Sequence, residues 1–185
     1  MSDLILASAS PRRKELLSLA GFDFEVITSD VDEVIDPTLK PCELVMSLAF
    51  QKARAVAKNN KAKTVVGSDT VVVLDGKVLG KPHSAEEAVQ MLKSLSGNTH
   101  EVFTGVCLIN GERKHCFYER TAVTFYPLED ELVAQYVASG DCMDKAGAYG
   151  IQGNGCVLVK GIEGDYFNVV GFPVARFCRE LKAFA

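Results

Sequence analysis

The stretch VVGSDTVVV, residues 65–73, contains the strongest β-strand signal in the chain. Valine runs of this kind are typical of strands that are covered on both faces of a sheet. A carboxylate in such a strand loses water and needs a partner, a hydrogen-bond network or a metal ion. We therefore interpret Asp69 as a functional residue at the carboxyl edge of a sheet, where α/β proteins bind ligands. The alternative is a strand end or bulge marked by Gly67, at which Asp69 makes only structural hydrogen bonds.

Length and composition restrict the class of protein. The chain has 185 residues, of which 48% are apolar, enough for one large domain or two tightly joined lobes. Its net charge of −4 disfavours a nucleic-acid groove. No apolar run approaches the length of a membrane span, and the N-terminal apolar run has no basic region before it, so we expect no signal peptide.

The cysteines and histidines do not have the spacing of a zinc site. The chain has six cysteines and three histidines, with no C-x-x-C pair. Without a signal peptide, we expect reduced thiols in a cytoplasmic protein. We expect each thiol to be a small buried side chain, and the alternative is that one of the cysteines is a nucleophile.

The apolar pattern predicts alternating strands and helices in the first half of the chain and hairpins in the second. Strands are expected at 3–7, 22–29 and 63–75, with helices over about 11–20, 41–58, 85–95, 128–138 and from 173. The turns at Asp75-Gly76 and Asn110-Gly111 predict hairpins. A further turn at Glu163-Gly164 separates CVLVKGI from YFNVVG. This order predicts an α/β protein with a mixed sheet and flanking helices, and no linker divides it.

The stretch SASPRR, residues 8–13, predicts a phosphate site at a helix start. Ser10 suits the N-cap and Pro11 the first helical position. Arg12 and Arg13 would then add guanidinium groups to the free N–H groups and the positive end of the helix. The small side chain of Ser8 lets a ligand approach. An ordinary capped helix with two solvated arginines is the alternative.

Other polar residues fit a polyphosphate site less specifically. The acidic loop SDVDEVIDP, residues 29–37, contains Asp30, Asp32 and Glu33, which fit either a divalent cation or a solvated turn. Lys52 and Lys81 could each bind phosphate or lie on the surface.

The glycine-rich segment 144–155 contains Gln152, whose amide could hydrogen-bond a base edge. It does not have the pattern of a dinucleotide-binding loop, and a long turn is the alternative.

Taken together, these pieces resemble the Maf (septum-formation) family of nucleotide pyrophosphatases. The matching stretches follow the family order over essentially the whole chain: LASASPRRKELL, SDVDE, LAFQKARAVA, VVGSDTVVVLDGKVLGKP, MLKSLSGNTHEVFTGV, DKAGAYGIQGNG and VVGFP. The resemblance implies a single domain over 1–185, built as an elongated mixed sheet with two lobes around a cleft and similar to the inosine triphosphatases. It also implies hydrolysis of nucleoside triphosphates to monophosphate and pyrophosphate with a divalent metal, Mg²⁺ or Mn²⁺, and a homodimer.

The resemblance also assigns roles to residues. Asp69 matches the proposed proton acceptor, and Glu33 with Asp69 would hold the metal. The positions linked to base choice in the dTTP/UTP branch carry Arg12, Thr70 and Gln152. The phosphate-binding positions carry Ser8, Arg13, Lys52 and Lys81.

The sequence thus predicts a pyrophosphatase acting on dTTP and UTP, with CTP or modified pyrimidine nucleotides as further candidates. The metal and cationic side chains would stabilise the departing pyrophosphate, and Asp69, acting directly or through the metal, would take a proton from water. Two alternatives are open. One is a nucleotide-binding regulator of cell division with little turnover, and the other is an inosine-triphosphate-cleansing enzyme with a different base pocket.

Overall fold

The computed structural model describes residues 3–29 and 31–184, so Asp30 lies outside the described residues. The strands are β1 (Leu4–Leu6), β2 (Glu25–Val26), β3 (Thr64–Leu74), β4 (Lys77–Leu79), β5 (Thr99–Asn110), β6 (Arg113–Phe125) and β7 (Val159–Glu163). The helices are α1 (Pro11–Leu19), α2 (Pro41–Ala57), α3 (Ala85–Leu95), α4 (Asp130–Ala138), α5 (Tyr166–Val170) and α6 (Val174–Phe184), with short 3₁₀ turns η1 (Ala146–Ala148) and η2 (Gly153–Val157).

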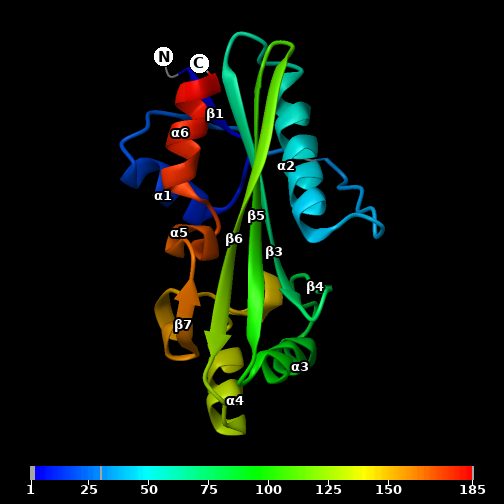
Figure 1. The fold of residues 1–185 in the computed structure, drawn as a ribbon, viewed down its shortest axis with the longest axis vertical. Helices are drawn as coiled ribbons and strands as arrows, with labels where there is room; N and C mark the ends of the chain where they lie inside the picture. Colours follow the sequence, from blue (N-terminus) through cyan, green and yellow to red (C-terminus); the bar gives the residue numbers. More distant parts are fainter. Residues whose placement is uncertain (1–2, 30, 185) are drawn as a thin grey trace. The chain divides into compact units, whose positions relative to one another are not determined.

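The strands form one mixed sheet, which confirms the predicted fold class (Figure 1). Its order is β2-β1-β3-β5-β6-β7, with β4 paired to β3. Strand β1 runs parallel to β2 and β3, whereas β4 and β7 are antiparallel to their partners. The parallel part follows from the early alternation of strands and helices, and the antiparallel pairing of β4 with β3 follows from the hairpin at Asp75-Gly76. Strand β7 reaches β6 by a long connection that contains α4. The described helices are each too short or too polar to cross a membrane.

One element is shorter than the sequence predicts, and one segment for which the sequence predicts no element forms a helix. The strand expected over 22–29 is reduced to β2, Glu25–Val26, and both of these residues are exposed. The segment YFNVVG forms the short helix α5. Asp165 lies just before this helix, and its carboxylate accepts a hydrogen bond from the N–H of Phe167 at 2.9 Å. A side-chain acceptor at this position favours a helix start over a strand.

The expectation of six reduced cysteines is wrong for one pair. Cys107 of β5 and Cys116 of β6 are disulfide-bonded, with their Cα atoms 4.2 Å apart. The long hairpin places the two residues opposite each other, a register that cysteine spacing alone does not reveal. The other four, Cys42, Cys142, Cys156 and Cys178, are free.

The chain divides into two compact units, and the first contains the parallel strands. It comprises residues up to Thr70, residues 104–119 and residues from Gly171 onward. Helix α2 packs on one face of β1, β3 and β5 through a buried apolar cluster that includes Ile5, Ala49 and Val65. Helices α1 and α6 lie on the other face (Figure 1). The C-terminal end of β1 and the middle of β3 therefore lie between helices from both faces. Asp69 is the sixth of the eleven residues of β3, and not at the carboxyl edge that the sequence predicts, because the strand continues through the valine run to Leu74.

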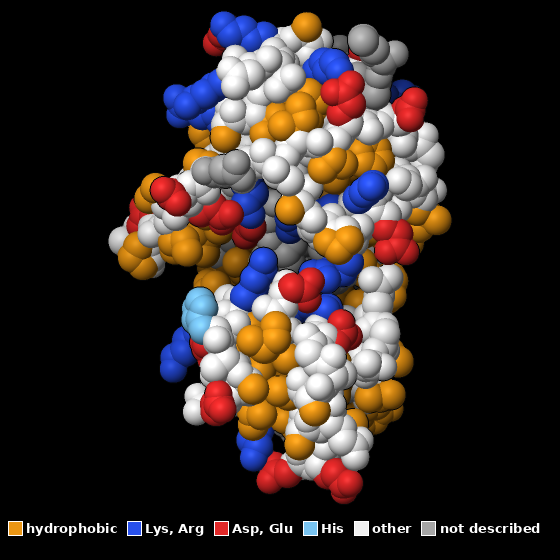
Figure 2. Space-filling view, turned by 180° about the vertical axis from the view of Figure 1, so that it is seen from behind, with side chains coloured by type: hydrophobic (Ala, Val, Ile, Leu, Met, Phe, Trp, Pro, Cys, Tyr) orange, Lys and Arg blue, Asp and Glu red, His pale blue; other side chains and the backbone are white. Residues whose placement is uncertain are grey.

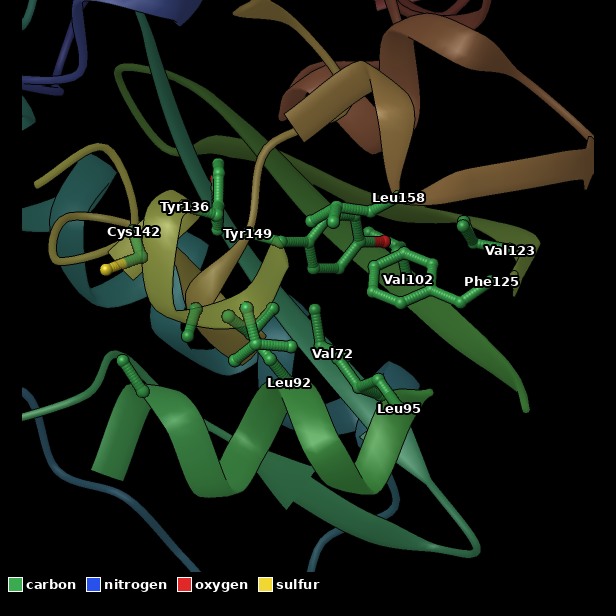
Figure 3. Close-up of a cluster of buried hydrophobic side chains, with 13 residues drawn as sticks. Val72, Leu92, Leu95, Val102, Val123, Phe125, Tyr136, Cys142, Tyr149 and Leu158 are labelled. Carbon is green, nitrogen blue, oxygen red and sulfur yellow. The ribbon is translucent and has the colours of Figure 1, made fainter. Parts of the chain in front are cut away.

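The second unit comprises residues 71–103 and 120–170 and has its own core. Residues of α3, α4 and the strands pack together there, and Figure 3 shows the ring of Tyr149 among Val102, Phe125 and Leu158. These side chains are each at most 5% exposed. This unit therefore supplies a rigid base for the glycine-rich segment 144–155.

Candidate active site

Asp69 has a specific partner in the structure. Its carboxylate forms an ion pair with the ammonium group of Lys52, and each side chain is 15% exposed. The same ammonium lies 3.1 Å from Oε1 of Glu33. One lysine of α2 therefore bridges a carboxylate from the acidic loop and a carboxylate from β3. The ion pair compensates the Asp69 carboxylate for the water that it loses in an otherwise apolar strand.

Two glycines let α2 approach the sheet closely enough for this contact. A Cβ atom on Gly67 would lie 2.2 Å from the carbonyl oxygen of Ala49, and one on Gly105 would lie 2.3 Å from that of Val45. Any side chain at these positions would overlap the backbone of α2. The sequence interruption at Gly67 is therefore a helix-packing position, two residues before Asp69 on the same face of β3.

Glu33 is brought to Lys52 by a second contact with α2. The side-chain amide of Gln51 donates to the carbonyl of Val34 at 3.0 Å, and its oxygen accepts from the N–H of Val34 at 2.9 Å. This two-way bond fixes the residue after Glu33 to the helix residue before Lys52. The acidic loop is therefore docked on the helix at this point and is not simply a solvated turn.

Arg13 is the most connected side chain of the predicted set. Its Nε donates to the carbonyl of Gly171 at 3.0 Å, and its Nη1 donates to the hydroxyl of Ser8 at 3.2 Å and to the carbonyl of Ser68 at 2.8 Å. Its Nη2 donates to the hydroxyl of Thr70 at 3.1 Å. Burial lowers the pKa of the guanidinium, and the charge of Asp69 opposes that effect. Arginine nevertheless keeps its charge in proteins, so Arg13 places a buried cation beside the middle of β3.

The predicted helix start is confirmed, with one difference in its capping. Helix α1 begins at Pro11 after Ser10, but the hydroxyl of Ser10 makes no capping bond. The buried hydroxyl of Ser8 instead accepts from the N–H of Ser10 at 3.2 Å. Arg12 is half-buried at the second position of α1.

The first unit thus brings together most of the predicted residues. Asp69, Lys52 and Glu33 form one ionic group on the α2 side of β3, and Arg13, Ser8 and Thr70 form a hydrogen-bonded group on the other side. Sequence reasoning missed two members of the second group, which are Thr104 and the carbonyl of Gly171. A threonine within a strand gives no local signal, and a carbonyl partner gives none at all.

The two predicted residues of the second unit, Lys81 and Gln152, are both exposed. The N–H of Gly147 donates to the carbonyl of Gly80 at 2.9 Å, which ties the glycine-rich segment to the residue before Lys81. The hydroxyl of Tyr136 accepts from the N–H of Gly150 at 3.1 Å. The segment that carries Gln152 is therefore anchored at two points within this unit.

The surface charge is mixed. Lys and Arg side chains lie beside Asp and Glu side chains over the face shown in Figure 2, in agreement with a net charge of −4. An anionic ligand would therefore depend on local cations such as Lys52 and Arg13.

Within the described residues, no group of three or more His, Cys, Asp and Glu side chains could hold a metal ion without other ligands. Glu33 and Asp69 are two oxygen donors that reach the same ammonium group. Mg²⁺ is commonly bound by one or two carboxylates together with water and substrate phosphates, so this pair fits such an ion.

Comparisons with known proteins identify the family of this chain. The family model described as Maf-like protein matches residues 3–184. The chain therefore belongs to the Maf-like protein family.

The relatives carry a more specific name. Proteins of Bacillus cereus strain G9842 and Bacillus mycoides strain KBAB4, each named dTTP/UTP pyrophosphatase, are 54% identical to this chain over 184 residues. The alignments cover 100% of this chain and 96% of each relative. A Bacillus anthracis protein of the same name matches with the same identity and coverage.

Two solved structures show a weaker likeness. The Staphylococcus aureus Ham1 protein is 19% identical with a TM-score of 0.47, covering 67% of this chain and 72% of that one. Protein VC0702 from Vibrio cholerae is 14% identical with a TM-score of 0.36, covering 76% of this chain and 68% of that one.

Proposed function

We propose that this protein is a nucleoside triphosphate pyrophosphatase that converts dTTP and UTP to the monophosphate and pyrophosphate. The observation that carries the proposal is the Lys52-bridged pair of carboxylates, Asp69 and Glu33, beside the buried cation Arg13. Full-length relatives named for this activity support it. CTP and modified pyrimidine nucleotides are further candidate substrates of the same site.

Asp69 acts as the general base in this proposal. Its carboxylate takes a proton from a water molecule as the water oxygen attacks the α-phosphorus. The bond between the α-phosphorus and the bridging oxygen breaks, and that oxygen leaves with the pyrophosphate. The ion pair with Lys52 directs the carboxylate.

The phosphate charge is offset by cations in the proposal. Lys52 and Lys81 supply ammonium groups, and Ser8 lies at the start of α1, where backbone N–H groups favour anions. Arg13 contributes mainly through its charge, because four of its five N–H groups already donate to protein atoms. Charge building on the departing pyrophosphate would be stabilised in this way.

Base choice is assigned to Arg12, Thr70 and Gln152. Because the hydroxyl of Thr70 is bonded to Arg13 and Thr104, Thr70 would contribute through its shape and not through a hydrogen bond to the base. Gln152 has a side chain that both donates and accepts, which suits the edge of a pyrimidine base. Arg12, next to the buried Arg13, adds a donor group.

Glu33 and Asp69 would hold a divalent cation, Mg²⁺ or Mn²⁺, together with phosphate oxygens of the substrate. The cation would supply neutralisation of phosphate charge. We further propose that the protein acts in the cytoplasm as a homodimer on free nucleotides, without nucleic-acid or membrane partners.

A nucleotide panel tests the proposal. The purified protein is incubated with Mg²⁺ or Mn²⁺ in ¹⁸O-water, and the products from dTTP, UTP, CTP, ITP and GTP are measured. We expect pyrophosphate from dTTP and UTP, with the label in the monophosphate. Label in the pyrophosphate would contradict attack at the α-phosphorus. Nucleotide binding without turnover under all conditions would favour the regulator, and preference for ITP would overturn the assigned base choice.

A further inference from the structure

The hydroxyl of Thr70 is held by three neighbours of the first unit. It accepts from Nη2 of Arg13 at 3.1 Å, and it lies 2.9 Å from the hydroxyl of Thr104 and 3.5 Å from the carbonyl of Gly171. Thr104, on β5, is 0% exposed. A hydroxyl has one proton and two lone pairs, so these partners account for its bonding capacity. The orientation of Thr70 is therefore fixed by the protein.

The same contacts surround Asp69 along the strand. Arg13 donates to the carbonyl of Ser68 at 2.8 Å and to the side chain of Thr70. Asp69 lies between these two residues and points to the opposite face of β3, where it meets Lys52. The guanidinium group of Arg13 thus holds the residues on both sides of Asp69. The hydroxyl of Thr104 holds the Thr70 hydroxyl in place for its bond with Arg13.

From this arrangement we infer that Thr104 is a positioning residue of the reaction. With Arg13 it holds Thr70, and through residues 68 and 70 it fixes the direction in which the Asp69 carboxylate leaves the strand. This inference rests on the proposed function, in which Asp69 is the general base. A base displaced by a fraction of an ångström loses rate without losing substrate affinity, because proton transfer depends steeply on geometry.

Thr104→Val tests the inference, because valine keeps the shape of threonine and removes its hydroxyl. We expect kcat for dTTP to fall about 10-fold with KM changed less than about 2-fold, the pattern of an interaction that matters only in the transition state. Thr104→Ser restores a hydroxyl and should bring kcat back to within about 3-fold of the wild type. Rates are divided by the folded fraction measured by circular dichroism.

A matched control lies on the same strand. The hydroxyls of Thr99 and Thr124 lie 2.8 Å apart at an exposed position of β5 and β6. Thr99→Val removes one member of that pair, and its kcat should equal that of the wild type. A wild-type kcat in Thr104→Val would overturn the inference. So would a raised KM at constant kcat, since that pattern indicates substrate binding.

Hydrogen exchange separates this inference from the proposed function. If the wild type releases no pyrophosphate, the proposed function is wrong. The exchange rates of the amides of residues 68–70 still report on the contacts that hold these residues. We expect about 10-fold faster exchange there in Thr104→Val, the equivalent of about 1.4 kcal/mol of local opening. If Thr104→Val does not fold, Arg13→Lys should show the same effect, because the lysine ammonium has three N–H groups and cannot bond all four acceptors of Arg13 at once. Unchanged exchange in the variant that folds would overturn the inference.

Discussion

His100 makes the stability of the protein depend on pH in a way that can be calculated. It is 1% exposed, its Nε2 lies 2.7 Å from the hydroxyl of Tyr149, and its Nδ1 has no partner among the described residues. Its ring packs edge-on against Phe125 at a centroid distance of 4.9 Å. Burial lowers the pKa of His100 from 6.5 to about 4, because the charged imidazolium would lose water and its Nδ1–H would have no acceptor among the described residues.

The direction of the change in stability follows from the pH at which the unfolded and the folded protein each take up a proton. As the pH falls, the unfolded chain protonates this histidine near pH 6.5 and the folded protein only near pH 4. The contribution of His100 is therefore complete above pH 6.5 and is lost progressively below it. Between pH 7.5 and pH 5, the free energy of unfolding should fall by about 2 kcal/mol on account of this one residue.

Urea unfolding followed by circular dichroism at pH 7.5 and pH 5 measures this loss. His100→Phe keeps an aromatic ring and removes the titrating group, so its loss should be smaller than that of the wild type by about 2 kcal/mol. His83 is exposed, and His83→Gln should lose as much as the wild type. Equal losses in the wild type and His100→Phe would refute the reasoning.

Two further variants test the packing that supports the candidate site. Gly67→Ala places a Cβ atom 2.2 Å from the carbonyl oxygen of Ala49, so the free energy of unfolding in urea should fall by about 3 kcal/mol. The control Gly161→Ala has open space around the new Cβ atom and should stay within about 0.5 kcal/mol of the wild type. Equal stability of the two variants would contradict the close approach of α2. Tyr136→Phe leaves the N–H of Gly150 without its acceptor and should cost about 1 kcal/mol in the same assay, whereas no loss would show that this bond does not stabilise the loop.

The sequence alone identifies Asp69, because a carboxylate interrupts the apolar pattern of the residues around it. Lys52 was also identified, as a phosphate ligand, but its ion pairs with Asp69 and Glu33 were not. Those contacts depend on how closely α2 approaches β3, which the missing side chain of Gly67 allows. The spacing of residues along one helix does not reveal the distance between α2 and β3.

Contacts between distant segments were the least predictable. Thr104 is an ordinary strand residue until the neighbouring strand places it 2.9 Å from Thr70. Likewise, Cys107 and Cys116 become partners only through the register of a long hairpin. By contrast, the mixed sheet and the start of α1 were predicted correctly, because alternation, turn residues and capping residues are local signals.

The most direct measurement compares pyrophosphate release from dTTP by the wild type and Asp69→Asn. Asparagine keeps the size of the side chain and cannot accept the proton from water, so turnover should fall by at least about 100-fold. Asp75→Asn, at the exposed turn after the same strand, removes an equal charge and should keep wild-type turnover. Full activity in Asp69→Asn would contradict the central claim that Asp69 is the base of a nucleotide pyrophosphatase.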